Sequence, residues 1–131
     1  MAAMQEPTFL ILTALASGPL HGYGVIQEVQ SLSGGDVVLR AGTLYGALDR
    51  LAEHGLITVD REEAVDGRLR RYYRLTDQGA ASLATEAGRL QRNAEAAASR
   101  LQIRARIANG LAMIAELPSV RPTTDPGGVT A

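Results

Sequence analysis

The sequence predicts a mainly α-helical fold with a small β-hairpin, and three features of the chain support this expectation. Leucines at helical spacing fill residues 40–57, an alternating pattern with an Asp-Gly pair covers residues 57–75, and residues 76–117 are rich in alanine and poor in helix breakers. With 131 residues, of which 46% are hydrophobic, the chain is long enough for one domain with a modest core.

The composition excludes several functional classes. No cysteine is present, so disulfides, thiolate metal sites and thiol catalysis are excluded. The net charge is only −1, so any surface for nucleic acid must be local, and every basic residue is an arginine, which suits bidentate contacts with phosphate. No apolar run approaches the roughly 20 residues that cross a membrane. No basic segment precedes the first apolar run, so we expect a cytoplasmic protein without a signal peptide.

Two short helices are expected at the start of the chain. The first begins at Pro7, is apolar almost all round and ends at Gly18; in so small a chain, part of such a surface is expected to contact a second subunit. The second lies in residues 21–35, with Tyr23 in its first turn. A first-turn tyrosine beside free backbone N–H groups can bind a phosphate, but Tyr23 could equally pack at the edge of the core.

The third helix lies in residues 40–57, after Val37, Val38 and Leu39, which are expected to form a short β-like segment. One face of this helix consists of Leu44, Leu48 and Leu51, and Gly55 is a natural left-handed stop. Near its start, the opposite face carries the hydroxyl of Thr43 and the phenol of Tyr45 with little other bulk. Such a helix can enter a DNA major groove with its first turn against the bases, or it can be an ordinary core helix with a wet face.

A β-hairpin should follow. Asp66-Gly67 is a strong signal for a tight hairpin turn between residues 57–63 and the return strand 68–75. Tyr73 and Leu75 should lie on the inner face near the base. The return strand also carries four arginines, Arg68, Arg70, Arg71 and Arg74. Such a basic wing can follow a phosphate backbone, although a solvated strand face is the plainer alternative.

The last predicted helix begins after Thr76, a good N-cap, and continues to about Leu117. Its leucines and alanines repeat at heptad spacing, and about 40 residues at 1.5 Å each span roughly 60 Å. That length is too great for so small a domain to cover, so we expect a homodimer. The predicted dimerisation residues are Phe9, Leu83, Leu90, Ala94, Leu101, Ala108 and Leu111, and a second apolar stripe holds Ile103, Ile107 and Ile114. Residues 118–131 are expected to be a disordered tail.

Three short helices, a hairpin and a long helix together make a winged helix-turn-helix in residues 1–75 with a C-terminal dimerisation helix in residues 76–117. The segments LHGYGVIQEV, AGTLYGALDRLAEHGLI and GRLRRYYRLTDQG, within Pro7 to Gly79, resemble the PadR family of bacterial transcriptional regulators, in its short branch with a single C-terminal helix. The resemblance implies a homodimeric repressor of inverted-repeat operators, released by a small hydrophobic or aromatic effector bound near the dimer interface.

The chain departs from the family pattern at a few positions. Gly46 follows the tyrosine of GTLY where a proline is common, and Arg40 and Ala41 stand where a serine or proline is common. Arg40 is a poor cap but suits a phosphate contact. The chain has no tryptophan, so a sandwich of aromatic rings around a flat drug is not expected.

These patterns lead to specific assignments. The predicted DNA-binding residues are Tyr23, Arg40, Gly42, Thr43, Tyr45, Arg50, Arg68, Arg70 and Arg71, with Thr43 and Tyr45 near base edges and Arg50 reaching the DNA backbone at most. An effector would lie between the first and last helices, against Phe9, Leu10, Thr13 and Leu90, although these residues could be plain dimer core.

An enzyme and a protein-binding module are the other classes to weigh. The only histidines are His21 and His54, and neither lies in a pattern of metal ligands, so we expect no enzyme, no metal and no cofactor. A winged helix that binds protein instead of double-stranded DNA agrees with the near-neutral charge. A DNA-binding surface, by contrast, must be positive around Tyr23, Thr43, Tyr45 and the arginine-rich strand.

Overall fold

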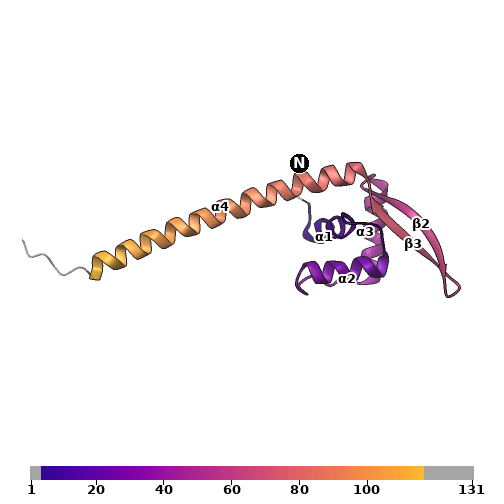
Figure 1. Cartoon of the computed structure of the whole chain (residues 1–131), viewed down its shortest axis with the longest axis horizontal. Coiled ribbons are helices and arrows are strands. Elements are labelled where there is room, and N and C mark those ends of the chain that lie inside the picture. The colour runs from indigo at the N-terminus through magenta and orange to yellow at the C-terminus, as the bar shows by residue number, and fades with distance from the viewer. Residues whose placement is uncertain (1–3, 117–131) are drawn as a thin grey trace, which may run out of the picture. The chain divides into compact units, whose positions relative to one another are not determined.

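The computed structural model describes residues 4–116. Two compact units make up the chain, Met1–Gln91 and Arg92–Ala131. The elements in order are α1 (Glu6–Leu15), β1 (Leu20–His21), α2 (Gly22–Leu32), α3 (Ala41–Glu53), β2 (Ile57–Val65), β3 (Arg68–Leu75) and α4 (Asp77–Glu116), as labelled in Figure 1. The first unit contains every element before α4 and the part of α4 up to Gln91.

The core of the first unit lies among α1, α2 and α3. The predicted leucine face of α3 is buried as expected, since Leu44 and Leu48 are fully buried and Leu51 is 7% exposed. Other fully buried side chains come from α1, α2 and β2: Ile11, Leu12, Leu15, Val25, Val29 and Ile57. Much of the apolar surface of α1 therefore contacts the core of its own chain, with Phe9 and Leu10 only partly buried.

A three-stranded antiparallel sheet in the order β1-β3-β2 covers this core. Strand β1 was not predicted, and it pairs Leu20 with Tyr73 and His21 with Tyr72. The prediction of a β-like segment at Val37–Leu39 is wrong, because these residues form no strand. Instead, the Val37 N–H donates to Ser33 Oγ at 2.9 Å, and Leu39 is buried in the core.

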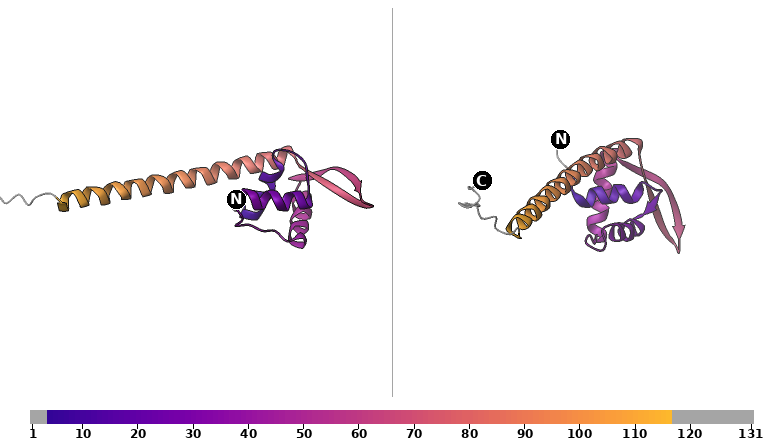
Figure 2. Two further views of the ribbon diagram at one scale, coloured as in Figure 1. Left: turned by 60° about the horizontal axis from the view of Figure 1, so that its bottom comes forward. Right: turned by 60° about the vertical axis from the view of Figure 1, so that its left-hand side comes forward.

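The hairpin β2–β3, called the wing below, extends away from the three short helices in Figures 1 and 2. Its turn is the predicted Asp66-Gly67 pair, with φ values of 50° and 74°. Positive φ at both positions is the type I′ geometry that matches the twist of paired strands. At the base of the wing, Tyr73 is buried and Leu75 partly buried on the core, as predicted.

Helix α4 begins where predicted. Thr76 Oγ1 accepts a hydrogen bond from the N–H of Gly79 at 2.9 Å and donates one to the Gly55 carbonyl at 2.6 Å. Gly79 lies so close to the α3–β2 connection that a Cβ there would be 1.9 Å from the carbonyl oxygen of Leu56. The start of α4 is therefore held against the first unit by its cap and by a close backbone contact.

The apolar residues of α4 are distributed differently in the two units. In the first unit, Leu83 packs against the core, and Leu90 is 39% exposed. In the second unit, the large apolar side chains are exposed: Leu101, Ile103, Ile107, Leu111, Met113 and Ile114. The predicted disordered tail, residues 118–131, lies outside the described residues.

Candidate nucleic-acid interface

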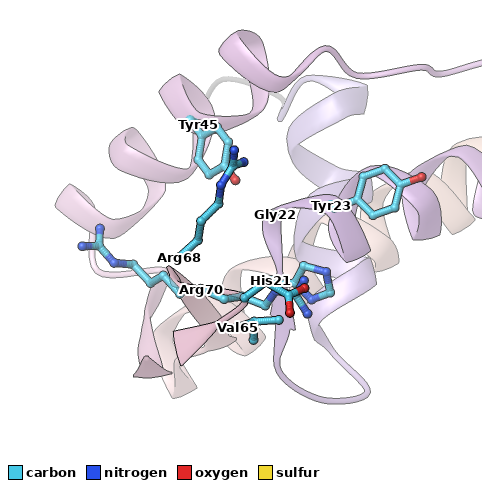
Figure 3. Close-up of a pocket in the computed structure, with 9 residues that line it drawn as sticks. His21, Gly22, Tyr23, Tyr45, Val65, Arg68 and Arg70 are labelled. Carbon is cyan, nitrogen blue, oxygen red and sulfur yellow. The ribbon is translucent and has the colours of Figure 1, made fainter. Parts of the chain in front are cut away.

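A surface cavity of about 530 Å³ lies where the start of α2, the first half of α3 and the tip of the wing meet. We call it the wing hollow, and Figure 3 shows its side chains. Its lining consists of His21, Gly22, Tyr23, Tyr45, Val65, Asp66, Arg68, Arg70 and Arg71. The structure thus brings together five residues predicted to bind DNA from three separate segments of the chain.

Tyr45 is held against the start of α2. Gly22, the first residue of α2, is buried, and a Cβ at this position would lie 2.6 Å from Tyr45 Oη and 2.9 Å from Tyr45 Cζ. Only glycine leaves room for the ring there. About half of Tyr45 (49%) is still exposed, so its phenol lies at the surface, beside the start of α2.

Tyr23 is 63% exposed, so it does not pack at the core edge. In Figure 3 its ring points away from Tyr45, while the side chain of Arg68 extends toward Tyr45. Tyr23 and Tyr45 therefore present two separate phenols at one surface, both beside the start of α2.

The wing arginines fall into two groups. In the first group, Arg71 Nε donates to Glu62 Oε1 at 3.2 Å, across the strand pair. Arg74 belongs to the same group, because its Nε lies 3.8 Å from Asp60 Oδ1. Within residues 4–116, Arg68 and Arg70 form no ion pair, even though Arg70 is opposite Glu63 in the register of β2 and β3. The wing hollow therefore holds two guanidinium groups whose charge is not neutralised by a carboxylate contact.

His21 is the functional candidate that sequence reasoning did not assign to this surface. Its ring packs edge-on against Tyr72, with the ring centroids 5.4 Å apart. Burial, and secondly the charge of Arg70, lower the pKa of His21 below its usual value. Both effects favour the neutral form of the His21 ring. The signal that could have found it is its position, directly before the first turn that contains Tyr23.

The other predicted DNA-binding residues lie on or beside α3, and none of them lines the wing hollow. Arg40, Gly42 and Thr43 are exposed at the start of the helix. Arg40 is the N-cap residue and forms no side-chain capping bond, while a Cβ at Gly42 would have no neighbour within 4 Å. Arg50 is exposed in the last turn.

A second cavity, of about 350 Å³, does not coincide with the predicted effector site. Its lining is Met4, Leu56, Ala81, Ser82, Thr85, Glu86 and Arg89, without Phe9, Leu10, Thr13 or Leu90. The buried carboxylate of Glu86 is paired with Arg89, and this hydrogen bond lowers the pKa of Glu86. Thr13 Oγ1 donates to the Phe9 carbonyl at 2.7 Å, so this hydroxyl is already used within α1.

Residues 4–116 contain neither a candidate metal centre nor a candidate membrane span. No group of three or more histidine, aspartate or glutamate side chains there could hold a metal ion. None of the helices in this part of the chain combines the length and apolar character that a membrane span requires.

Comparison with known families decides the assignment of this fold. Residues 11–85 match the model of the transcriptional regulator PadR-like family. The chain belongs to this family. The fold class is confirmed by solved structures, including a PadR family regulator from Clostridium difficile with a TM-score of 0.62 and 24% identity over 74% of this chain and 99% of that one. Family membership also confirms, at the level of the family, a transcriptional regulator rather than an enzyme.

Individual relatives agree with the family assignment. The chain is 42% identical over 73 residues to the transcriptional regulator Rv3488 of Mycobacterium tuberculosis, covering 56% of this chain and 64% of that protein. It is 35% identical over 75 residues to the transcriptional regulator YqjI of Escherichia coli, covering 57% of this chain and 34% of that protein. The chain thus spans less than two thirds of the length of either relative.

One solved neighbour contains nucleic acid. PadR of Bacillus subtilis, in complex with operator DNA, matches with a TM-score of 0.57 and 26% identity over 64% of this chain and 46% of that one.

Proposed function

We propose that this PadR-family chain is a sequence-specific, DNA-binding transcriptional regulator that acts as a homodimer. The observation that carries the proposal is the wing hollow, which joins two unpaired guanidinium groups, Arg68 and Arg70, to the exposed phenols of Tyr23 and Tyr45. Unpaired arginines beside an exposed helix start are what a phosphate backbone and an adjacent groove require. The operator complex of the related Bacillus subtilis PadR supports the same role.

Within this proposal, residues 1–75 bind DNA and α3 is the recognition helix. Thr43 and Tyr45 in its first turns contact base edges or the phosphates beside them, and Gly42 lets the DNA approach closely because no side chain stands there. Tyr23 binds a phosphate from α2. The remaining phosphate contacts come from Arg40, Arg50, Arg68, Arg70 and Arg71.

Residues 76–117 supply the dimer contact in this proposal. Leu101 and Leu111 are 61% and 62% exposed in the single chain, and a second copy of α4 would remove this apolar surface from water. Phe9, Leu90, Ala94 and Ala108 would contribute to the same interface, while Leu83 mostly supports its own domain. A two-fold dimer places two recognition helices about 34 Å apart, which matches an inverted repeat.

We further propose that the dimer represses transcription and is released by a small hydrophobic or aromatic effector. A dimer that occupies an operator excludes other proteins from that DNA. The effector site would form between α1 and α4 at the dimer interface, against Phe9, Leu10, Thr13 and Leu90. Phe9 and Leu10 retain partly exposed apolar surface for such a contact.

The test is selection of bound fragments from random DNA, followed by binding measurements on the selected site and on a scrambled one. We expect an inverted repeat and strong discrimination between the two DNAs. Thr43→Ala should change the preference at one position of each half-site, by about 1–3 kcal/mol if a base contact is lost. Equal binding of both DNAs at every salt concentration would refute sequence-specific regulation and favour a protein-binding module.

A further inference from the structure

His21 lines the wing hollow, but it is not among the residues proposed above to contact DNA. It is the last residue of β1 and the N-cap residue of α2, and the sheet pairs it with Tyr72. Its ring lies over the first turn of α2, where a Cβ on Gly24 would be 3.4 Å from His21 Cε1 and 3.5 Å from Nδ1. The imidazole is thus held by Tyr72 on one side and by the backbone of α2 on the other.

The charges around His21 are mainly positive. The wing hollow contributes Arg68, Arg70 and Arg71 from β3, and its carboxylate is Asp66, in the turn of the wing. Three phenols also lie around it, those of Tyr23 of α2, Tyr45 of α3 and Tyr72 of β3. From β2, the guanidinium of Arg61 lies over the Tyr72 ring, 4.0 Å from its centroid, and is paired with Asp60. Arg71 is paired with Glu62, so within the described part of the chain the unpaired positive charges of the hollow are those of Arg68 and Arg70, and Asp66 is its unpaired carboxylate.

We propose that His21 is a DNA-phosphate-binding residue, and that it takes up a proton when DNA binds. The inference rests on the proposed function, because a phosphate of the DNA must enter the wing hollow beside Arg68 and Arg70. Protonated imidazole donates from both ring nitrogens and carries a positive charge, so it interacts with a phosphate more strongly than the neutral ring does.

The direction of the resulting pH dependence follows from the surroundings of the ring. In the free protein, partial burial and the charge of Arg70 lower the pKa of His21 and so favour the neutral ring. A phosphate in the hollow offsets the arginine charges and raises this pKa. DNA affinity therefore increases as the pH falls through the pKa of the complex, and levels off below the pKa of the free protein. Each proton taken up changes the affinity by up to about tenfold per pH unit.

The chain offers a matched control because it has only two histidines. His54 lies at the opposite end of α3 from Thr43, where its Nδ1 is 2.6 Å from the carbonyl oxygen of Arg50. It does not line the wing hollow. His21→Gln and His54→Gln therefore separate an effect of this surface from a general effect of histidine protonation.

The experiment measures the affinity of wild type, His21→Gln and His54→Gln for the selected operator between about pH 5.5 and 8 at constant ionic strength, above the usual carboxylate range. We expect wild type and His54→Gln to bind more tightly as the pH falls. His21→Gln should lose that dependence, so the difference in affinity between wild type and His21→Gln should widen toward low pH. Equal pH dependence in wild type and His21→Gln would overturn the proposal.

A second measurement uses the wild-type protein and is independent of any folding defect in the variant. Titration of the His21 ring protons by NMR, without and with operator DNA, should show a higher pKa in the complex. An unchanged His21 pKa would overturn the inference. Failure of the wild type to bind any DNA in the whole pH range would instead refute the proposed DNA-binding function, so the two failures are distinguishable.

Discussion

Removal of single wing arginines should have unequal effects on DNA binding, because the structure pairs some of them with carboxylates and leaves others unpaired. Each phosphate contact of an unpaired arginine releases a counterion, and its loss reduces the slope of log affinity against log salt by about 0.9. A homodimer carries each arginine twice, so Arg70→Ala or Arg68→Ala should reduce the slope by about 1.8. Between 50 and 200 mM salt, wild-type affinity should then fall about twelvefold more than that of the variant.

Arg71 and Arg74 provide the comparison within the same strand. Arg71 is bonded to Glu62 and Arg74 lies beside Asp60, so each must leave or share a carboxylate to reach a phosphate. Exposed ion pairs of this kind stabilise a protein by about 0–1 kcal/mol. The carboxylates therefore neutralise the charges of Arg71 and Arg74 in part, but either arginine can still separate from its partner. We expect Arg71→Ala to reduce the slope less than Arg70→Ala does, and Glu62→Gln to increase the affinity by freeing Arg71.

Fluorescence anisotropy with the selected operator, at a series of salt concentrations, measures all of these slopes. Circular dichroism of each variant checks that the overall secondary structure is unchanged. Equal slope changes for Arg70→Ala and Arg71→Ala would show that the ion pair with Glu62 does not limit Arg71. A slope unchanged by both Arg68→Ala and Arg70→Ala would show that the wing hollow does not contact phosphates at all.

Three other substitutions test the fold and the assembly. Gly79→Ala places a Cβ 1.9 Å from the backbone oxygen of Leu56, so the free energy of unfolding in urea should fall by about 1–3 kcal/mol. Gly22→Ala should displace Tyr45 and weaken operator binding at an unchanged melting temperature, and it should add little to Tyr45→Ala in a double-mutant cycle. Leu101→Glu should convert a wild-type dimer into a monomer in sedimentation, and a monomeric wild type would contradict the proposed assembly.

The parts of the fold that could be predicted are those fixed by nearby residues. The leucine face of α3, the Asp66-Gly67 turn and the Thr76 cap each depend on a few neighbouring positions, and all three are present as expected. Strand β1 has only two residues and pairs with β3 far along the chain, so it carries no periodic signal. The segment Val37–Leu39 has strand-like residues, but tertiary burial of Leu39 and the bond to Ser33 determine its conformation.

The candidate site was predictable in residue type but not in detail. A cluster of arginines and a first-turn tyrosine are visible in the sequence, and both contribute to the wing hollow. The two-residue turn also sets Glu62 opposite Arg71, so that pair follows from the hairpin register. The pairing of Asp60 with both Arg61 and Arg74 could not be predicted from the hairpin register. It depends on an irregularity in β2, between Val59 and Arg61, where Asp60 has no residue of β3 opposite it. His21 lies at the hollow because β1, which was not predicted, pairs it with Tyr72 of β3.

The ion pairs of the wing explain how a chain with a net charge of −1 can present a positive surface. Asp60 pairs with Arg61 and Arg74, and Glu62 pairs with Arg71, so the wing arginines without an ion pair in residues 4–116 are the two that line the wing hollow, Arg68 and Arg70. Charges separated by more than about 10 Å are largely screened at 0.1 M salt, so DNA in the hollow interacts with these local groups and hardly with the net charge. A regulator built this way gains little long-range attraction to DNA in general. Its affinity therefore depends on fitting α3 and both wings of the proposed dimer onto one site, which favours discrimination between operators over tight binding to any sequence.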